Sequence, residues 1–459
     1  MEGEKITIGV KTLLGNPKKA IIKLSIPMTI GMIAQTAYNV ADAIWVSGLG
    51  PDSLAAIGFF FPIYFILMSL AGGIGVGASS AISRKIGAKD KASADKIAIQ
   101  SIVLSFIASL IISIPLLPFL ETIIRNLGAK NISFLTTQYG RVILAGTIFL
   151  FFSNISNAIL RGEGDTKKAM WAMVSGSILN IILDPMFIYV LKLGVVGAAL
   201  ASILSMALVS ALFIYWLFFQ KKTFVSIHFN EFKFTKEILR EIFSVGIPSS
   251  MIQMGNAFSM FFINLIAIKA GGTDGVAVFT SGWRIVMIGT LPMIGMAMGV
   301  TAVTGAAYGA KEYKKLKTAY FYAIRTGLII EVIAGILLFT FAKPVSFIFT
   351  YAPETRRISE DLIHFLKVMC AFYPFIPLGM LTSAMFQGIR RGFLALIITL
   401  TRTILLNVPL AYILSIVIKL GSPGVWWGIV LGNATAGLLS LTIATIIMHK
   451  CRKNLEICS

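Results

Sequence analysis

The sequence predicts an all-α polytopic membrane protein with 12 transmembrane helices in two six-helix lobes. Three observations support this class. Of the 459 residues, 57% are hydrophobic and 13% are charged, whereas soluble domains carry about 25% charged residues. Apolar runs of roughly 20 residues, enough to span a bilayer as a helix, recur along the whole chain. These runs lack the alternating pattern of a membrane β-barrel.

The net charge of +20 is explained by where the basic residues lie relative to the predicted membrane spans. In a soluble protein such an excess would suggest nucleic-acid binding, but here Lys and Arg gather in every second loop, which marks the cytoplasmic side. We therefore expect no nucleic-acid partner, a plasma-membrane location and both termini in the cytoplasm. The N-terminus lacks the apolar core of a signal peptide, and Cys370, Cys451 and Cys458 form no disulfide or metal pattern.

The first half begins with a basic, amphipathic lead-in that carries Lys11 and Lys18. Its helices are expected at about 21–46, 54–82, 97–119, 133–160, 168–190 and 195–219. Pro27 lies inside the first of these helices, where it should kink the helix or create a bending point. Residues 1–219 thus form the N-lobe. The polar residues 220–240 should be a cytoplasmic linker with a short surface helix.

The second half repeats this scheme, so residues 241–459 form the C-lobe. Its helices are expected at about 241–269, 276–308, 318–341, 358–388, 393–417 and 424–448. The dipeptide I-P at 26–27 recurs at 247–248, and residues 77–90 align with 299–312. Each half crosses the membrane six times, an even number, so the second half starts on the same side as the first. The repeats are therefore parallel and related by a pseudo-two-fold axis along the membrane normal. A substrate site then belongs at their interface, with rocking of the halves giving alternating access.

Two carboxylates in apolar helices are the features that most need an explanation. Gln35, Tyr38 and Asp42 share one face of the first helix, and Asn180 and Asp184 lie four residues apart on the fifth. The repeat pairs Asp42 with Ile263 and Asp184 with about Val408, so the acids are confined to the first half. An ionisable side chain at membrane depth is by default a functional-site hypothesis. The other polar side chains of this first half include Asn154, Asn157, Ser202 and Ser205.

These oxygen-bearing side chains suit a hard cation such as Na⁺, and desolvated carboxylates equally suit a proton. The alternative is that each polar side chain only bonds a neighbouring helix. The second half has its own intramembrane charges, among which Arg325 and Glu331 are six residues apart, a poor spacing for a pair within one helix. We expect Glu331 to pair with a base on another helix; a second ion or proton site is the alternative.

Several motifs recur along the chain in a recognisable combination. The longest is I-P-M-T-I-G-M-I-A-Q-T-A-Y-N-V-A-D-A-I-W-V-S-G-L-G at 26–50, followed by L-A-A-I-G-F-F-F-P-I. The others are L-R-G-E-G-D-T-K-K-A-M after the fourth helix, N-I-I-L-D-P in the fifth, G-V-V-G-A-A before the sixth and M-F-Q-G-I after the tenth. Together they resemble the multidrug and toxic compound extrusion (MATE) family, and most closely the archaeal branch of its DinF-like subfamily. The resemblance covers essentially the full chain.

The resemblance implies two lobes around a central cleft and a secondary active antiporter that exports amphipathic, often cationic compounds against Na⁺ or H⁺ entry. Its N-lobe cation site maps onto Asp42, Asn157, Asn180, Asp184 and Ser202, with Na⁺ at Asp42, Asn180 and Asp184. Its substrate cavity maps onto Gln35, Tyr38, Tyr139 and Asn154, and the bending of its first helix onto Pro27. An acidic C-lobe site known in another subfamily is not matched, because S-S-M-I-Q-M-G-N-A in the seventh helix has no acid.

Two other functions remain to be weighed. A flippase for a lipid-linked precursor is the nearest, because its superfamily shares the fold, although such proteins tend to have cationic cavities. An intramembrane aspartyl protease also needs two membrane aspartates, but its G-x-G-D signature is absent before Asp184. We therefore expect no enzymatic activity and no cofactor besides the coupling cation. The expected partners are small amphipathic molecules and membrane lipid, and the expected state is a monomer.

Overall fold

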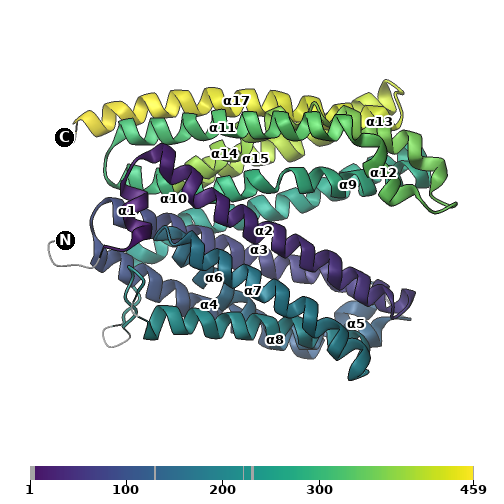
Figure 1. Cartoon of the computed structure of the whole chain (residues 1–459), viewed down its shortest axis with the longest axis horizontal. Coiled ribbons are helices and arrows are strands. Elements are labelled where there is room, and N and C mark those ends of the chain that lie inside the picture. Colours follow the sequence, from purple (N-terminus) through teal and green to yellow (C-terminus); the bar gives the residue numbers. More distant parts are fainter. Residues whose placement is uncertain (1–5, 129–130, 221, 229–231, 458–459) are drawn as a thin grey trace. The chain divides into compact units, whose positions relative to one another are not determined.

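The computed structural model describes residues 6–128, 131–220, 222–228 and 232–457 of the chain (Figure 1). Within these ranges every regular element is a helix, and no strand is found. In this described part of the chain, eleven helices are long and apolar enough to cross a membrane, or up to twelve if one bent pair counts as a single span. The protein is therefore a multi-pass helical membrane protein, and the predicted all-α fold is confirmed.

The helices of the first half agree with the predicted spans and are longer at most ends. Asp90 caps the third span, because its side chain accepts a hydrogen bond from the Ser93 backbone N–H at 3.0 Å. The fourth predicted span is a pair, α5 and α6, bent by 49° at Gly146. A Cβ at Gly146 would lie 2.3 Å from Ile203. The elements are α1 (Ile8–Leu14), α2 (Pro17–Ser47), α3 (Pro51–Gly87), α4 (Lys91–Asn126), α5 (Ser133–Ala145), α6 (Thr147–Gly162), α7 (Thr166–Pro185), the π-helical η1 (Met186–Val190), α8 (Gly194–Ile214) and the π-helical η2 (Tyr215–Phe219).

The second half has more breaks than its sequence predicts. Helix α9 (Lys236–Gly289) has 54 residues. A straight helix of this size would be about 80 Å long, more than twice the thickness of the hydrocarbon core of a bilayer. Gly272 interrupts it with φ 61° and ψ −152°, so α9 holds the seventh span and the start of the eighth. The remaining elements are α10 (Leu291–Gly309), α11 (Tyr313–Thr340), α12 (Ala342–Thr350), the 3₁₀ turn η3 (Arg356–Ile358), α13 (Ser359–Met369), the 3₁₀ turn η4 (Tyr373–Phe375), α14 (Ile376–Gly388), α15 (Gly392–Leu400), the π-helical η5 (Thr401–Asn407), α16 (Val408–Tyr412), the π-helical η6 (Ile413–Val417) and α17 (Ser422–Ile457).

Two local expectations were wrong. The short helix α12 lies in a loop for which no helix was predicted. The surface helix expected within 220–240 is not found among the described residues there, where 222–228 and 232–235 are non-helical and helix begins at Lys236. Side-chain contacts explain the extended linker, because Glu163 and Asp95 accept hydrogen bonds from its backbone N–H groups and thereby take the place of helical bonds.

The described chain packs as two compact units. Unit 1 contains Met1–Gly15 and Pro27–Ser250, and unit 2 contains Asn16–Ile26 and Met251–Ser459. The units therefore divide the chain differently from the predicted lobes at two places. Unit 2 includes the first turns of α2, and unit 1 includes the linker with the first turns of α9.

The internal repeat is visible in the backbone. The π-helical η1 and η6 are each followed by a lysine of positive φ, Lys192 at 54° and Lys419 at 63°. Counting back two residues from each π segment pairs Asp184 with Ala411, not with Val408 as predicted. Counting back from the positive-φ Gly50 and Gly272 likewise pairs Asp42 with Asn264, not with Ile263. Both acids still have no acidic counterpart in the second half.

Each of these two π segments packs against a glycine of the following helix. A Cβ at Gly197 would lie 2.6 Å from the Phe187 carbonyl oxygen, and a Cβ at Gly424 would lie 2.6 Å from Ser415 backbone atoms. Real side chains do not approach a backbone so closely. The glycines therefore allow the close approach of consecutive helices in both halves.

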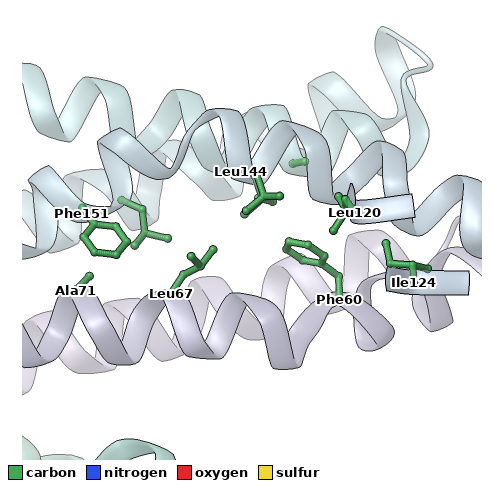
Figure 2. Packing of buried hydrophobic residues seen from close by; sticks show 10 residues of the cluster. Phe60, Leu67, Ala71, Leu120, Ile124, Leu144 and Phe151 are labelled. Carbon is green, nitrogen blue, oxygen red and sulfur yellow. The ribbon is translucent and has the colours of Figure 1, made fainter. Parts of the chain in front are cut away.

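An apolar cluster forms the centre of unit 1, where side chains of α3 face those of α4, α5 and α6 (Figure 2). Phe60 and Leu67 of α3 point toward Leu144 and Leu120 in this view, and all four are at most 1% exposed. Tyr64 and Tyr139 are partly buried against this cluster. The packed core therefore holds two tyrosines that belong to the site described below.

Candidate functional site

The site is built around two carboxyl groups on α2 and α7. Asp184 is 0% exposed, and no N–H or hydroxyl group among the described residues hydrogen-bonds either of its oxygens. The group within hydrogen-bonding reach is the carboxyl of Asp42. Two carboxyl groups can share a hydrogen bond only if one of them carries a proton, so this geometry can hold a proton between them.

The acid pair has no basic partner in the described part of the chain. Among the residues that the structure describes, no Lys, Arg or His nitrogen lies within 4.0 Å of either carboxylate. Buried carboxylates without a base are costly unless a proton or a metal ion neutralises them. The described residues also contain no group of three or more His, Cys, Asp or Glu side chains that could hold a metal ion. Two acids with neutral oxygens around them can be neutralised by a proton or by a bound cation.

Three tyrosines surround the acids. Tyr38 on α2 and Tyr139 on α5, both predicted cavity residues, lie close enough to Asp42 to interact with it electrostatically. Tyr64 on α3 was not predicted, yet it hydrogen-bonds Tyr38 and also interacts with Asp42. Tyr139 is held by an edge contact with Phe60, with ring centroids 5.6 Å apart. The site therefore combines two acids with phenol rings that can donate hydrogen bonds and present aromatic faces.

Asn180 and Ser202 lie next to the acid pair, on α7 and α8. The Asn180 Nδ2 donates to the Ser202 Oγ at 3.4 Å, while its Oδ1 is buried and has no donor among the described residues. Because Asn180 lies one turn before Asp184, this amide oxygen is a free ligand on the same helix face. Ser205, one turn further along α8, instead donates to the Ala201 carbonyl at 2.8 Å.

Asn157, by contrast, makes other contacts. Its Nδ2 donates to the Ala169 carbonyl at 3.1 Å, and its Oδ1 accepts a hydrogen bond from Arg161 at 2.6 Å. Each end of the amide therefore makes one hydrogen bond away from the acid pair. Asn154, the predicted cavity residue one turn earlier, is partly buried and donates to the Leu150 carbonyl at 2.9 Å.

Two predicted residues lie on α2 itself. Gln35 is partly buried, on the same helix as Tyr38 and Asp42. Pro27 is buried, and α2 continues through it without a break. This conformation thus has an unbroken first helix, and bending at Pro27 stays a prediction.

The loop after α6 contains a further buried acid that the sequence reading did not single out. Glu163 is 0% exposed, and its Oε2 accepts hydrogen bonds from the backbone N–H groups of Phe224 and Val225 at 2.8 and 3.1 Å. Burial raises the pKa of Glu163 to about 8. In the same loop Asp165 caps α7 by accepting from the Lys168 N–H. The L-R-G-E-G-D motif therefore joins the linker to the helical part of unit 1.

The intramembrane bases expected to neutralise Glu331 do not do so. Glu331 is 0% exposed, and within the described residues no Lys, Arg or His nitrogen lies within 4.0 Å of it. Arg284, Arg325 and Lys367 are exposed instead. The predicted pairing of Glu331 with a base is therefore wrong.

Comparisons with known proteins agree with this architecture. The MatE family profile matches residues 27–186 and 248–413. The multidrug export protein MepA of Staphylococcus aureus strain N315 is 29% identical over 435 residues, which cover 94% of each protein. A solved outward-facing multidrug resistance MATE transporter of the MOP superfamily is 50% identical, with 98% of this chain and 100% of that chain covered and a TM-score of 0.96. A MOP superfamily transporter from Pyrococcus furiosus, described as having a binding pocket of reverse polarity that suggests a different function, is also 50% identical, with the same coverage and a TM-score of 0.95.

Proposed function

This chain belongs to the MatE family, and we propose that it exports amphipathic, often cationic compounds across a membrane in exchange for Na⁺ or H⁺. Its relatives are named as multidrug export proteins and multidrug resistance transporters. The observation that carries the coupling is the Asp42–Asp184 pair, in which a fully buried carboxyl has another carboxyl beside it and no base among the described residues. Such a pair must take up a proton or a cation, or else bear a costly buried charge.

In the proposed mechanism the coupling ion binds at Asp42 and Asp184 and substrate leaves outward. Asn180 and Ser202 supply neutral oxygens for Na⁺, whereas the Asn157 Oδ1 already accepts a hydrogen bond from Arg161 and has one lone pair left for a cation. Tyr38, Tyr139, Gln35 and Asn154 would line the substrate cavity. When the ion binds, the charge of the pair falls, and a cationic substrate beside it is held less strongly.

The driving force is sufficient for this exchange. One elementary charge that crosses 100 mV contributes about 2.3 kcal/mol, which corresponds to a roughly 50-fold concentration ratio. We further propose alternating access, bending of the first helix at Pro27, a plasma-membrane location and cytoplasmic termini. The protein would act as a monomer in contact with lipid, with no cofactor, nucleic-acid partner or catalytic activity.

The experiment that tests this proposal is efflux of a fluorescent cationic dye from proteoliposomes under a separately imposed Na⁺ or H⁺ gradient. We expect one gradient to drive efflux in the wild type and Asp184→Asn to abolish it without unfolding the protein. Asp52→Asn makes the same change at an exposed acid in the first turn of α3 and should transport normally. Normal efflux by Asp184→Asn would refute the assigned role.

A flippase for a lipid-linked precursor is the second candidate. The relative described with a pocket of reverse polarity and a suggested different function is the observation that keeps it open. Folded wild-type protein that moves no dye under either gradient, but translocates a fluorescent polyprenyl phosphate, would favour the flippase.

A further inference from the structure

Glu331 is a buried carboxyl of unit 2 that the proposed mechanism does not use. It lies on α11 and is 0% exposed, and neither of its oxygens has a hydrogen-bond partner among the described residues. A charged carboxylate in such a place, without a base or a donor, is strongly disfavoured. The group must therefore be neutralised by something other than a side chain of the described protein.

The glycines one turn on either side of Glu331 define what this face of α11 touches. A Cβ at Gly327 would lie 3.1 Å from Met293, Pro377 and Leu381, and a Cβ at Gly335 would lie 3.2 Å from the Cys370 carbonyl oxygen. Glu331 therefore faces α10, the start of α14 and the segment where α13 ends. Close packing of this kind leaves little room for a hydrated metal ion.

Two helix breaks meet beside the carboxyl. The tenth span is interrupted between α13 and α14, and the eighth between α9 and α10. Tyr373, in the first break, donates a hydrogen bond to the Val286 carbonyl in the last turn of α9 at 3.1 Å. Tyr373 also lies close enough to Glu331 to interact with it electrostatically. Interrupted helices at membrane depth are typical of places where transporters bind ions.

The repeat shows that the fold itself does not require an acid at this place. Counting equal numbers of residues from the positive-φ Lys89 and Lys311 pairs Glu331 with Ser109 of α4. Ser109 is also buried, but its hydroxyl donates to the Phe106 carbonyl at 2.8 Å. The first half therefore fills the equivalent position with a neutral side chain whose hydrogen bond is satisfied.

The groups that could influence the charge of Glu331 are few. Of the elements packed against α11, α14 contains no ionisable side chain. Tyr373 and the Cys370 thiol, which donates to the Leu366 carbonyl, are the ionisable groups in the break. The other ionisable groups on α9, α10, α11, α12, α13, α17 and the nearby η5 include one fully buried phenol, Tyr320, whose hydroxyl shares a hydrogen bond with Thr382 of α14. Partly buried groups on these elements include Asp274, Tyr308, Tyr322 and Arg402, and exposed groups include Lys269, Arg284, Arg325, Lys343, Glu360, Asp361, His364, Lys367 and His449.

We propose that Glu331 is a second proton-binding carboxyl, separate from Asp42 and Asp184, and that it takes up and releases a proton during the transport cycle. A proton needs no further ligands, whereas Na⁺ would need several oxygens around a side chain that faces mostly apolar groups. The binding itself is independent of the proposed antiport, but participation in the cycle rests on that proposed function.

The binding is tested by infrared difference spectroscopy of the purified full chain between neutral and alkaline pH, with ¹³C-labelled glutamate. The label separates glutamate carboxyls from those of Asp42 and Asp184. We expect a protonated-glutamate band that disappears in Glu331→Gln and persists in Glu312→Gln, an acid at the start of the same helix that pairs with Lys315. Glu163→Gln identifies the contribution of the other buried glutamate. A spectrum unchanged by Glu331→Gln would overturn the proposal.

The role in the cycle is tested by the number of protons moved per dye molecule in proteoliposomes. We expect Glu331→Gln to lower this ratio by one while dye efflux persists, whereas Asp184→Asn stops efflux. An unchanged ratio, with the infrared band lost, would refute participation in transport and leave only static binding. If Glu331→Gln does not fold, Glu331→Asp should move the band from labelled glutamate to unlabelled aspartate, and its absence there would contradict the assignment.

Discussion

Removal of the Glu163 side chain should release the linker from the helices of unit 1. In the structure a single oxygen of this buried carboxyl accepts the backbone N–H groups of both Phe224 and Val225, at 2.8 and 3.1 Å. Glu163→Ala leaves both N–H groups without an acceptor. Each buried N–H group without a hydrogen bond destabilises the closed linker by about 1–3 kcal/mol. Because water can reach part of the opened linker, we expect a loss of about 2–4 kcal/mol in the free energy of local opening.

Limited trypsin digestion measures this opening, because Lys222 and Lys233 flank the bound segment and are exposed. When opening is fast relative to cleavage, the cleavage rate follows the population of the open form. The expected loss corresponds to roughly 30-fold to 1,000-fold faster cleavage in Glu163→Ala. Glu163→Gln keeps an acceptor oxygen and should stay within a few-fold of the wild type. Equal rates for Glu163→Ala and the wild type would refute the reasoning.

The same contact should depend on pH. Burial raises the pKa of Glu163 from 4.5 to about 8, so the folded protein binds more protons there than the unfolded chain does between these values. The stabilising contribution is therefore complete below pH 4.5 and is lost as the pH rises through about 8. Relative to Glu163→Gln, wild-type cleavage should accelerate over this range. A constant ratio between the two proteins would contradict the assigned pKa.

Two further predictions concern η1 and the start of α8. Gly197→Ala should lower the thermal stability by about 1–3 kcal/mol, because its Cβ would lie 2.6 Å from the Phe187 carbonyl, whereas Gly58→Ala, with nothing within 4 Å, should be neutral or stabilising in the same melting experiment. Tyr189→Phe removes the hydroxyl that donates to the Trp45 carbonyl and should cost about 1 kcal/mol. Equal melting temperatures for Tyr189→Phe and the wild type would show that this contact contributes nothing.

Most of the fold could be predicted because length and hydropathy decide whether a segment can cross a bilayer. The predicted spans fail where a local backbone event decides the structure. The break at Gly272 falls between two predicted spans, beside Lys269 and Asp274. The breaks before α10 and α14, by contrast, fall in sequences that remain apolar. Hydropathy does not change at these points, so no periodicity could have located them.

The site could be predicted in part. Asp42 and Asp184 stand out because charge is rare in apolar helices, and the structure places them together. Tyr64 could not be predicted as a site residue. It follows F-F-F-P-I, and one more aromatic side chain in such an aromatic-rich segment gives no sign of a function. The contact of Asn157 with Arg161 did have a signal, namely their spacing of one helical turn. Glu331 was misjudged because sequence spacing does not show which way a base on another helix points.

The π-helical segments bear on the ancestry of the chain. A π-turn closes its hydrogen bond one residue later than an α-turn, so each segment holds one surplus residue. The segments η1 and η6, both followed by K-L-G, occupy the same place in the two halves, which implies that this surplus was inherited from a single ancestral half. The stretch before η1 is α-helical throughout α7, while its counterpart includes η5. This difference between the halves therefore arose after the duplication, when they had begun to diverge.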